Sequence, residues 1–250
     1  GDSLEKLWAR YLVDIQLNAD QLAEYLHHGN PHVRSWTVRL LCDRGRFPQA
    51  VAAQIAELAQ TEPNVEVRTQ LACSARRLSP DQGLPIVREL LQRDEDVNDI
   101  FQPLLLWWAI EDKWRRDAGG VMEVFCSSAG GDEPLVETHI THRLRRRFAA
   151  TGKRSDRAYC SRQFELAPTD AHRQQLLKGF EEAYAGRSLA TLPKTLAQQI
   201  NDLGGGSLAL RVRGGDADAP KESLKLIADE PAETNLRRDL IEVLAEIELA

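Results

Sequence analysis

The chain of 250 residues carries a formal net charge of -6 at pH 7, and 42% of its residues are hydrophobic, which is enough for a substantial buried core. This acidic total argues against a general nucleic-acid binder, and no apolar run reaches the roughly 20 residues that a membrane-spanning helix needs. The cysteines show neither CxxC nor CxxCH spacing, which excludes a c-type haem attachment and the usual zinc spacings within this segment. They are predicted to be buried thiols that act as small hydrophobic side chains: Cys42, Cys73, Cys126 and Cys160.

The first part of the chain is predicted to form paired helices. Apolar positions with helical spacing are separated by glycine, proline or acidic turns, which is the punctuation of an all-α protein. The first predicted helices run to about Ile15, from about Ala19 to His28, and from Pro31 to Gly45.

The same pattern then recurs at a fixed spacing. Pro48 opens a helix that ends at the turn Glu62-Pro63-Asn64, and a partner helix follows. Aligning Val33-Arg34 with Val67-Arg68 gives the period of the repeat, which is the step from position 34 to position 68. Two-helix units at this spacing predict an α-solenoid, in which each unit packs on its neighbours.

A third pair opens at Pro80 and ends in the most apolar stretch of the chain. The residues from Ile100 to Ile110 show no one-sided stripe, which predicts a helix buried on every side, with Pro103 tolerated in its first turn. Trp107 and Trp108 are therefore predicted to lie in the core. We expect Trp108→Ala to cost about 3–5 kcal/mol of stability.

Beyond Lys113 the helices continue but the repeat becomes irregular. Glycine turns are predicted at Ser128–Gly131 and at Gly204–Gly206. Because the last helix ends on Leu249-Ala250 without the polar cap that a solenoid needs, we expect the segment to belong to a larger chain. We interpret residues 1–250 as one helical repeat domain, most regular over 19–113 and irregular over 117–250. The later helices are predicted at 117–127, 133–150, 156–166, 170–185, 192–203, 207–213, 220–228 and 235–247.

Particular residues of these units resemble known families. The segments Asn30-Pro31-His32-Val33-Arg34 and Glu62-Pro63-Asn64-Val65-Glu66-Val67-Arg68 resemble HEAT repeats, which implies a right-handed superhelix of antiparallel helix pairs. The segment from Pro103 to Glu111 is similar to the helical middle region of large membrane-bound dehydrogenases from planctomycete-type bacteria. The segment from Ser207 to Ala217 fits the same region.

This second resemblance implies a role within an exported, periplasmic oxidoreductase. In that family a sugar-dehydrogenase-like β-propeller precedes the helical region and a c-type haem domain follows it. Neither is present in this sequence, so no catalytic, cofactor-binding or metal-binding residue carries over, and the haem is expected outside the segment. What carries over is a non-catalytic scaffold whose partners are protein domains of the same or another chain. Without the resemblance, a cytoplasmic location is the expectation.

A basic run is the main candidate interaction surface. Between His139 and Arg187 there are eleven Lys and Arg residues against five Asp and Glu. Such a cluster can steer an anionic partner, and it can equally be a solvated helix face offset by acidic neighbours. The candidate residues are Arg143, Arg146, Arg147, Arg154 and Arg157.

The remaining polar motifs favour structural roles. Arg34 and Arg68 occupy the position at which HEAT units use an arginine to tie neighbouring turns together, through hydrogen bonds to carboxylates or carbonyls. His27, His28 and His32, and the pair His139 and His142, lack the acidic or cysteine partners of a metal site. Two alternatives remain open at this point: a HEAT-like DNA-binding protein of the alkylpurine DNA glycosylase type, and a free-standing HEAT adaptor.

Overall fold

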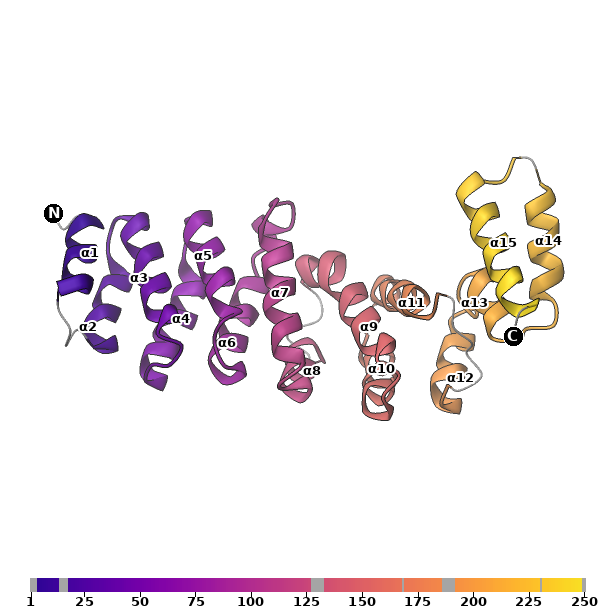
Figure 1. Cartoon of the computed structure of the whole chain (residues 1–250), viewed down its shortest axis with the longest axis horizontal. Coiled ribbons are helices and arrows are strands. Elements are labelled where there is room, and N and C mark those ends of the chain that lie inside the picture. Colours follow the sequence, from indigo (N-terminus) through magenta and orange to yellow (C-terminus); the bar gives the residue numbers. More distant parts are fainter. Residues whose placement is uncertain are drawn as a thin grey trace. The chain divides into compact units, whose positions relative to one another are not determined.

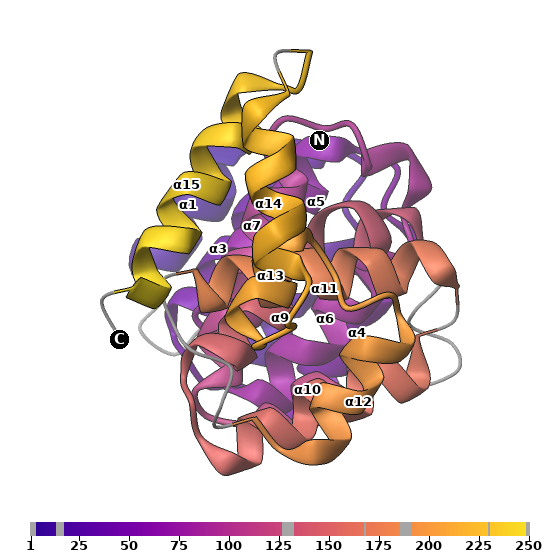
Figure 2. The same ribbon diagram turned by 90° about the vertical axis from the view of Figure 1, so that its right-hand side faces the viewer.

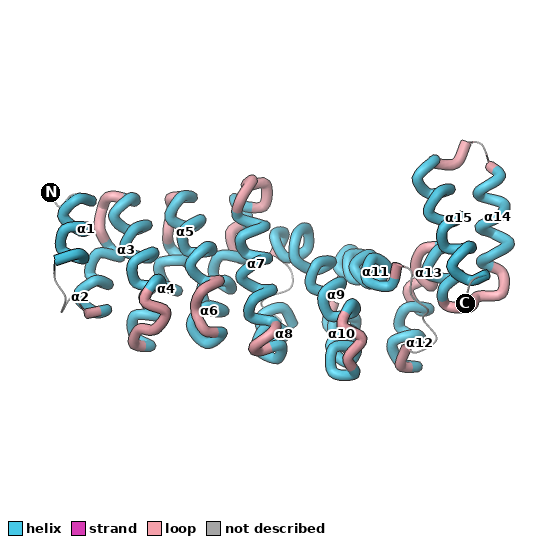
Figure 3. Tube along the Cα trace, in the orientation of Figure 1, coloured by secondary structure: helices cyan, strands magenta, loops and turns pink. Residues whose placement is uncertain are grey.

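The computed structural model contains only helices and loops over the residues that it describes, so the prediction of an all-α fold is confirmed (Figure 3). The described residues are 4–13, 18–126, 133–167, 169–185, 192–229 and 231–248. Ile15 and the predicted turn Ser128–Gly131 lie outside them, as does the side chain of Cys126. The chain divides into two compact units, Gly1–Ile140 and Thr141–Ala250, and each is described by itself.

The first unit consists of two rows of helices, and successive members of each row pack side by side (Figure 1). Short helical turns at Glu24–His27, Asp94–Asp96 and Val136–Ile140 join or flank them. One row contains α1 (Leu4–Val13), α3 (Pro31–Asp43), α5 (Val65–Ala75) and α7 (Gln102–Trp114). The other row contains α2 (Ala19–Ala23), α4 (Gln49–Thr61), α6 (Pro80–Leu91) and α8 (Ala118–Cys126).

The core of the first unit lies between these two rows. Each helix buries its apolar side against the opposite row, as in Leu41 of α3, Ile55 of α4 and Leu71 of α5, all fully buried. A fully buried side chain of this size contributes about 1.5–3 kcal/mol relative to an exposed one. The rows are therefore held together chiefly by apolar burial, helix pair by helix pair.

Helix α7 departs from its prediction, because it is buried on one side only. Leu106 and Ile110 are fully buried, whereas Leu104 is 41% exposed and Trp108 is 40% exposed. Trp107 is partly exposed as well. Two rows give each helix neighbours at its sides and in the opposite row, so one side of it faces outwards. The prediction that Trp108 lies in the core is wrong, so the large cost expected of Trp108→Ala loses its structural basis.

The second unit is also helical. The long helix predicted over 133–150 is divided into the π-helical turn Val136–Ile140, at the end of the first unit, and α9. In the second unit, α9 packs along α11, while α13, α14 and α15 pack against one another around Val212, Ala219 and Val243 (Figure 2). Its helices are α9 (Thr141–Ala150), α10 (Arg154–Leu166), α11 (Asp170–Tyr184), α12 (Lys194–Asp202), α13 (Leu208–Arg213), α14 (Ala219–Ala228) and α15 (Thr234–Glu248).

Two glycine positions in the second unit have clear steric reasons. A Cβ atom on Gly179 of α11 would meet the backbone carbonyl of His142, so this glycine allows α9 and α11 to approach closely. Gly204, Gly205 and Gly206 all have positive φ, a conformation that glycine adopts without strain. The predicted glycine turn at 204–206 is thereby confirmed.

Candidate functional site

A buried ion pair joins the turn before α3 to the turn before α5. The Arg34 guanidinium donates from Nε to Oε2 of Glu62 at 2.7 Å and from NH2 to Oε1 at 2.6 Å. Its NH1 donates to the carbonyl oxygens of His28, at 2.8 Å, and Gly29, at 3.3 Å. The guanidinium therefore ties together two turns that belong to successive helix pairs.

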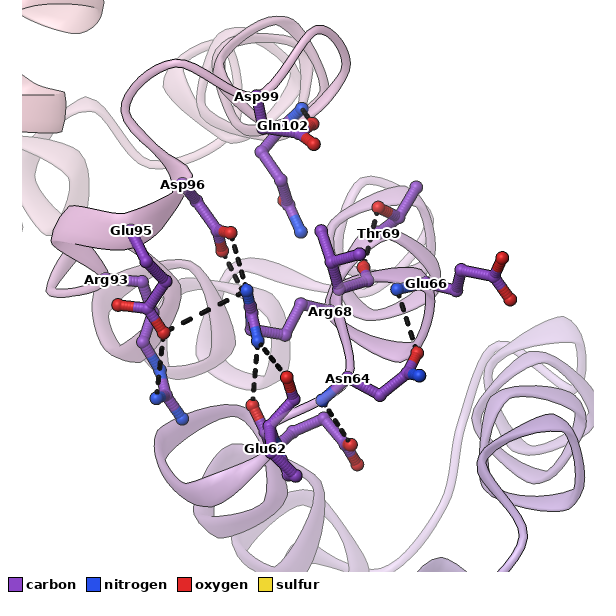
Figure 4. Close-up of polar contacts among 12 residues, drawn as sticks. Glu62, Asn64, Glu66, Arg68, Thr69, Arg93, Glu95, Asp96, Asp99 and Gln102 are labelled. Carbon is purple, nitrogen blue, oxygen red and sulfur yellow. Dashed lines mark hydrogen bonds and ion pairs between the residues drawn. The ribbon is translucent and has the colours of Figure 1, made fainter.

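The same contact set recurs one unit later, around Arg68 (Figure 4). Its Nε donates to Oδ2 of Asp96 at 2.7 Å and its NH2 donates to Oδ1 at 2.6 Å. Its NH1 donates to the carbonyl oxygens of Glu62, at 3.1 Å, and Pro63, at 2.8 Å. The arginines, the carboxylates and the carbonyls of the two sets are each one period of the repeat apart along the chain, so the predicted roles of Arg34 and Arg68 are confirmed.

Glu62 belongs to both sets. Its carboxylate, whose side chain is fully buried, binds Arg34 and also accepts a hydrogen bond from the backbone N–H of Asn64 at 2.9 Å. Its carbonyl binds Arg68. The hydrogen bonds that Arg34 donates to Glu62 raise the pKa of Arg34, and those that Arg68 donates to Asp96 raise the pKa of Arg68, in each case against the lowering effect of burial. We call the two connected ion pairs the arginine ladder.

The ladder ends at α7 because the repeat gains one residue there. Asn64 Oδ1 caps α5 by accepting from the N–H groups of Glu66 and Val67, and Asp99 Oδ1 accepts with the same spacing from the N–H groups of Phe101 and Gln102, just before and at the start of α7. The step from Asn64 to Asp99 is one residue longer than the period that relates Arg34 to Arg68. In that register the residue equivalent to Arg68 is Pro103, which has no side-chain donor, so a third rung cannot form.

The register also explains an unusual buried amide. Gln102 is equivalent to Val33 and Val67, which are fully buried apolar residues. Gln102 is fully buried too, and among the described residues no group bonds to either atom of its amide. A buried polar group without a partner costs about 1–3 kcal/mol. The α7 unit therefore contains a local defect where the two preceding units are well packed.

The outward side of α3, α5 and α7 forms a continuous face, which we call the row face. Cross-links between neighbours include His32 with Glu66 at 3.9 Å and the ion pair of Asp43 with Arg77. Equivalent positions on this face are His32, Ser35 and Arg39 on α3, Glu66, Thr69 and Cys73 on α5, and Phe101, Leu104 and Trp108 on α7. At these three positions the row face is thus polar on the first two helices and apolar on the third, although Val65 of α5 is also 38% exposed.

The predicted basic run is divided between two helices that pack against each other, α9 and α10, and one of its arginines is buried. Arg145, in the middle of the run, is fully buried, donates from NH1 to the carbonyl of Cys160 at 2.5 Å and lies over the Phe164 ring at 3.9 Å. Arg146 is exposed and pairs with Glu182 of α11 at 3.5 Å. Arg143 and Arg147 are partly exposed on α9, whereas Arg154 and Arg157 lie on the next helix, α10.

The histidines and cysteines are placed as structural residues. His28 Nδ1 accepts from the N–H of Asn30 at 3.0 Å, and His139 Nε2 lies 2.8 Å from the carbonyl of Val97. Within the described residues, no group of three or more His, Cys, Asp or Glu side chains could hold a metal ion. Cys42 and Cys160 are buried thiols, as predicted, and burial raises the pKa of Cys42 to about 12. The prediction is wrong for Cys73, which is partly exposed on the row face.

A hollow of about 630 Å³ lies beside α12 and α13 in the second unit. Gly205, Gly215 and Arg211 contribute to its lining. The Arg211 guanidinium is already held by Asp216 at 2.8 Å and by Glu222 at 2.7 Å. The positive charge of Arg211 is therefore balanced by these two carboxylates, so the hollow does not favour an anionic ligand.

The carboxylates of the ladder were not identified from the sequence. Glu62 follows Arg34, and Asp96 follows Arg68, by the same separation along the chain, and this equal spacing is the signal that finds them. The sequence offers no comparable signal for the exposed apolar side of α7 or for the burial of Lys113 and Arg145.

Comparison with known proteins does not add to this assignment. No model of a known protein family matches the chain, and no curated protein matches it significantly. Separately, no helix in the described part of the chain has the length and apolar composition needed to cross a bilayer.

Proposed function

We propose that the chain is a HEAT-like α-solenoid that acts as a non-catalytic scaffold and protein-interaction module. The observation that carries this proposal is the arginine ladder, in which one contact set recurs after one period with the same donors, the same kind of acceptor and nearly the same distances. Repeated units of this kind make extended binding surfaces.

The ladder supports a scaffold because of where it puts its charges. Arg34, Glu62, Arg68 and Asp96 are all largely buried and bind one another or the backbone. Truncating one partner of such a pair leaves a buried charge uncompensated, at a cost of about 3–5 kcal/mol. The ladder therefore fixes how consecutive units stack and takes no part in ligand chemistry, while the row face remains available to a partner.

The resemblance of Pro103–Glu111 to planctomycete-type membrane-bound dehydrogenases gives this scaffold a more specific context. We propose that it links a propeller dehydrogenase domain to a c-type haem domain in a larger exported oxidoreductase. The segment itself then needs no cofactor, and its partners are those two domains. The support for this step is the sequence resemblance alone.

The experiment is made on the native protein in its source cells. An antibody against this segment is used to record the mass of the reacting band and its staining for covalent haem, with the purified segment of 28.1 kDa as the control. We expect a band several times larger that stains for haem. A haem-free band at the mass of the purified segment would contradict the redox context. Stoichiometric haem binding by the isolated segment would contradict the non-catalytic role.

A further inference from the structure

The strongest unassigned feature of the molecule is an apolar stripe along the outward side of α7. It consists of Phe101, 58% exposed, Leu104, 41% exposed, and Trp108, 40% exposed. Leu104 and Trp108 are four residues apart and lie on the same side of α7, and Phe101 immediately precedes the first residue of the helix. Ile100, 80% exposed, precedes Phe101. Contiguous exposed apolar side chains of this kind mark interaction sites.

The neighbouring helices show that the stripe is specific to α7. At the equivalent positions, α5 carries Glu66, Thr69 and Cys73, and α3 carries polar residues as well. All three helices belong to one row, and each buries the side that faces the other row. The apolar stripe on α7 is therefore not required for packing in this row, since α3 and α5 pack in the same way without one.

The size of the stripe indicates a short segment as its occupant. Seven residue steps along a helix rise about 10 Å, which corresponds to two helical turns. A stable dimer of folded proteins buries about 800 Å² on each partner, far more than two turns of one helix offer. An apolar line of this length matches the apolar side of a short partner helix, which presents side chains at i, i+3 or i+4, and i+7.

The charges at one end of the stripe specify the chemistry of that segment. Arg115 lies one heptad beyond Trp108, and the Arg76 guanidinium lies 5.9 Å from the Trp108 ring centroid. Both arginines are exposed, and within the described residues neither makes an ion pair with a carboxylate. The nearby Asp112 is already engaged with the buried Lys113 at 2.9 Å and with Arg116 at 3.7 Å. This end of the stripe therefore favours a negatively charged partner group.

We propose that the α7 stripe binds a short amphipathic helix of a partner protein, with apolar side chains over Phe101, Leu104 and Trp108 and carboxylates beside Arg76 and Arg115. This inference rests on the proposed scaffold function and names the class of partner that its row face takes. The partner's apolar line is two turns long, and its acidic residues lie at one end of that line.

The test uses a phage-displayed library of random dodecapeptides, selected on the whole chain. Enriched peptides are synthesised and titrated by fluorescence anisotropy against the wild type and three variants. Leu104→Glu places a charge in the middle of the stripe, and Arg76→Glu with Arg115→Glu reverses its charged end. Thr69→Glu changes the equivalent position on α5 and is the matched control. Circular dichroism melting shows that each variant folds, and Leu104→Ser replaces Leu104→Glu should the latter unfold.

We expect enriched peptides with the apolar spacing and with Asp or Glu at one end. Leu104→Glu should weaken their binding about tenfold or more, which corresponds to about 1.4 kcal/mol, and the double arginine variant should weaken it several-fold. Thr69→Glu should change it less than twofold. The proposal would be overturned if no peptide were enriched, if the enriched peptides were basic, or if their binding survived Leu104→Glu.

The remaining occupant is a second copy of the chain, and sedimentation velocity distinguishes it. A dimer that Leu104→Glu dissociates would assign the stripe to self-association and overturn the proposal, whereas a monomer at tens of micromolar is the expected result. Peptide binding that does not depend on the stripe would leave the scaffold function in place. A native chain without haem would remove the redox context but leave the peptide result unchanged.

Discussion

Helices α5 and α7 occupy successive places in one row, yet they use the same positions differently. Helix α5 carries Arg68, which extends the arginine ladder, and it presents Glu66 and Thr69 to solvent. In α7 the equivalent residues are Pro103, Phe101 and Leu104, so the ladder stops and the outward side becomes apolar. The difference therefore separates buried ion pairs, which connect the earlier helix pairs, from an exposed apolar side on α7.

One additional residue before α7 accompanies this change. The step between the side-chain acceptors Asn64 and Asp99 is longer by one residue than the step between Asn30 and Asn64, and the inward and outward positions of the helices follow these acceptors. The predictions below test this register, in order from the largest expected effect to the smallest.

Glu62→Ala should have the largest effect because Glu62 joins both rungs of the ladder. The change leaves the Arg34 guanidinium and the N–H of Asn64 without their buried acceptor, and we expect a loss of about 3–5 kcal/mol in the free energy of unfolding. Urea denaturation measures it. Glu57→Ala, on the exposed side of the preceding helix α4, is the control and should stay within about 0.5 kcal/mol. A loss no larger than that of the control would contradict the claim that the arginine ladder stabilises the protein.

Arg68→Met should destabilise by about 3 kcal/mol, since it leaves the buried Asp96 carboxylate unpaired. Adding Asp96→Leu removes the uncompensated charge, and the double variant should recover most of the loss. A double-mutant cycle by urea denaturation measures the coupling between the two residues. Additive losses in the two single variants would mean that the pair does not act as a unit.

Lys113→Leu tests the register at the end of α7. Lys113 is fully buried and is equivalent to Leu78, which is also fully buried. Its Nζ donates to the carbonyl of Arg76 at 2.6 Å and to Asp112, but burial still lowers the pKa of Lys113. We expect Lys113→Leu to stabilise the protein by about 1–2 kcal/mol at pH 7.

The pH dependence of that gain gives a second measurement. The unfolded lysine has a pKa of about 10.4, and the folded one is lower, so between the two values the unfolded chain binds more protons. The wild type should therefore become more stable, relative to Lys113→Leu, as the pH rises through this window. The full penalty is present below the folded pKa. A constant difference between the two proteins from pH 7 to about 10.4 would show that Lys113 is not a buried cation.

Gln102→Val should stabilise the protein by about 1 kcal/mol, because it replaces an unpartnered buried amide with the residue found at positions 33 and 67. Thermal and urea denaturation measure the gain. The same substitution at Gln60, which is exposed on α4, is the control and should have little effect. A destabilised Gln102→Val variant would indicate that the amide has a role which the register does not account for.

Trp108→Ala should have the smallest effect, below about 1 kcal/mol, because its side chain is 40% exposed. Leu106→Ala, two residues earlier and fully buried, should cost about 2–5 kcal/mol by opening a cavity. Comparing the two variants by urea denaturation tests which side of α7 faces inwards. Equal losses of stability in the two variants would show that Trp108 is buried in the core.

The sequence predicted those parts of the molecule that depend on local repetition. The helix pairs, their proline and asparagine starts, and the tying role of Arg34 and Arg68 follow from residues close together in the chain or one period apart. Glu62 and Asp96 were within reach of the same reasoning, because the same separation between arginine and carboxylate occurs twice.

The exposure of the α7 stripe could not be predicted from the sequence for a physical reason. When a helix is apolar on every side, apolar contacts are favourable all round it. The sequence does not show which of these sides packs against other helices of the chain and which one stays exposed. The burial of Lys113 and Arg145 was missed because long cationic side chains usually face solvent, and their carbonyl acceptors come from distant turns.

The central claim is that one row face is polar on α5 and becomes a docking site on α7. The most direct measurement places a photo-crosslinking amino acid at Leu104 or at Thr69 of the native chain in its source cells and identifies the linked peptides by mass spectrometry. We predict that Leu104 links to an amphipathic peptide with acidic residues at one end, in at least tenfold greater yield than Thr69. Equal yields at the two positions, or linkage of Leu104 to α7 of a second copy, would contradict the account.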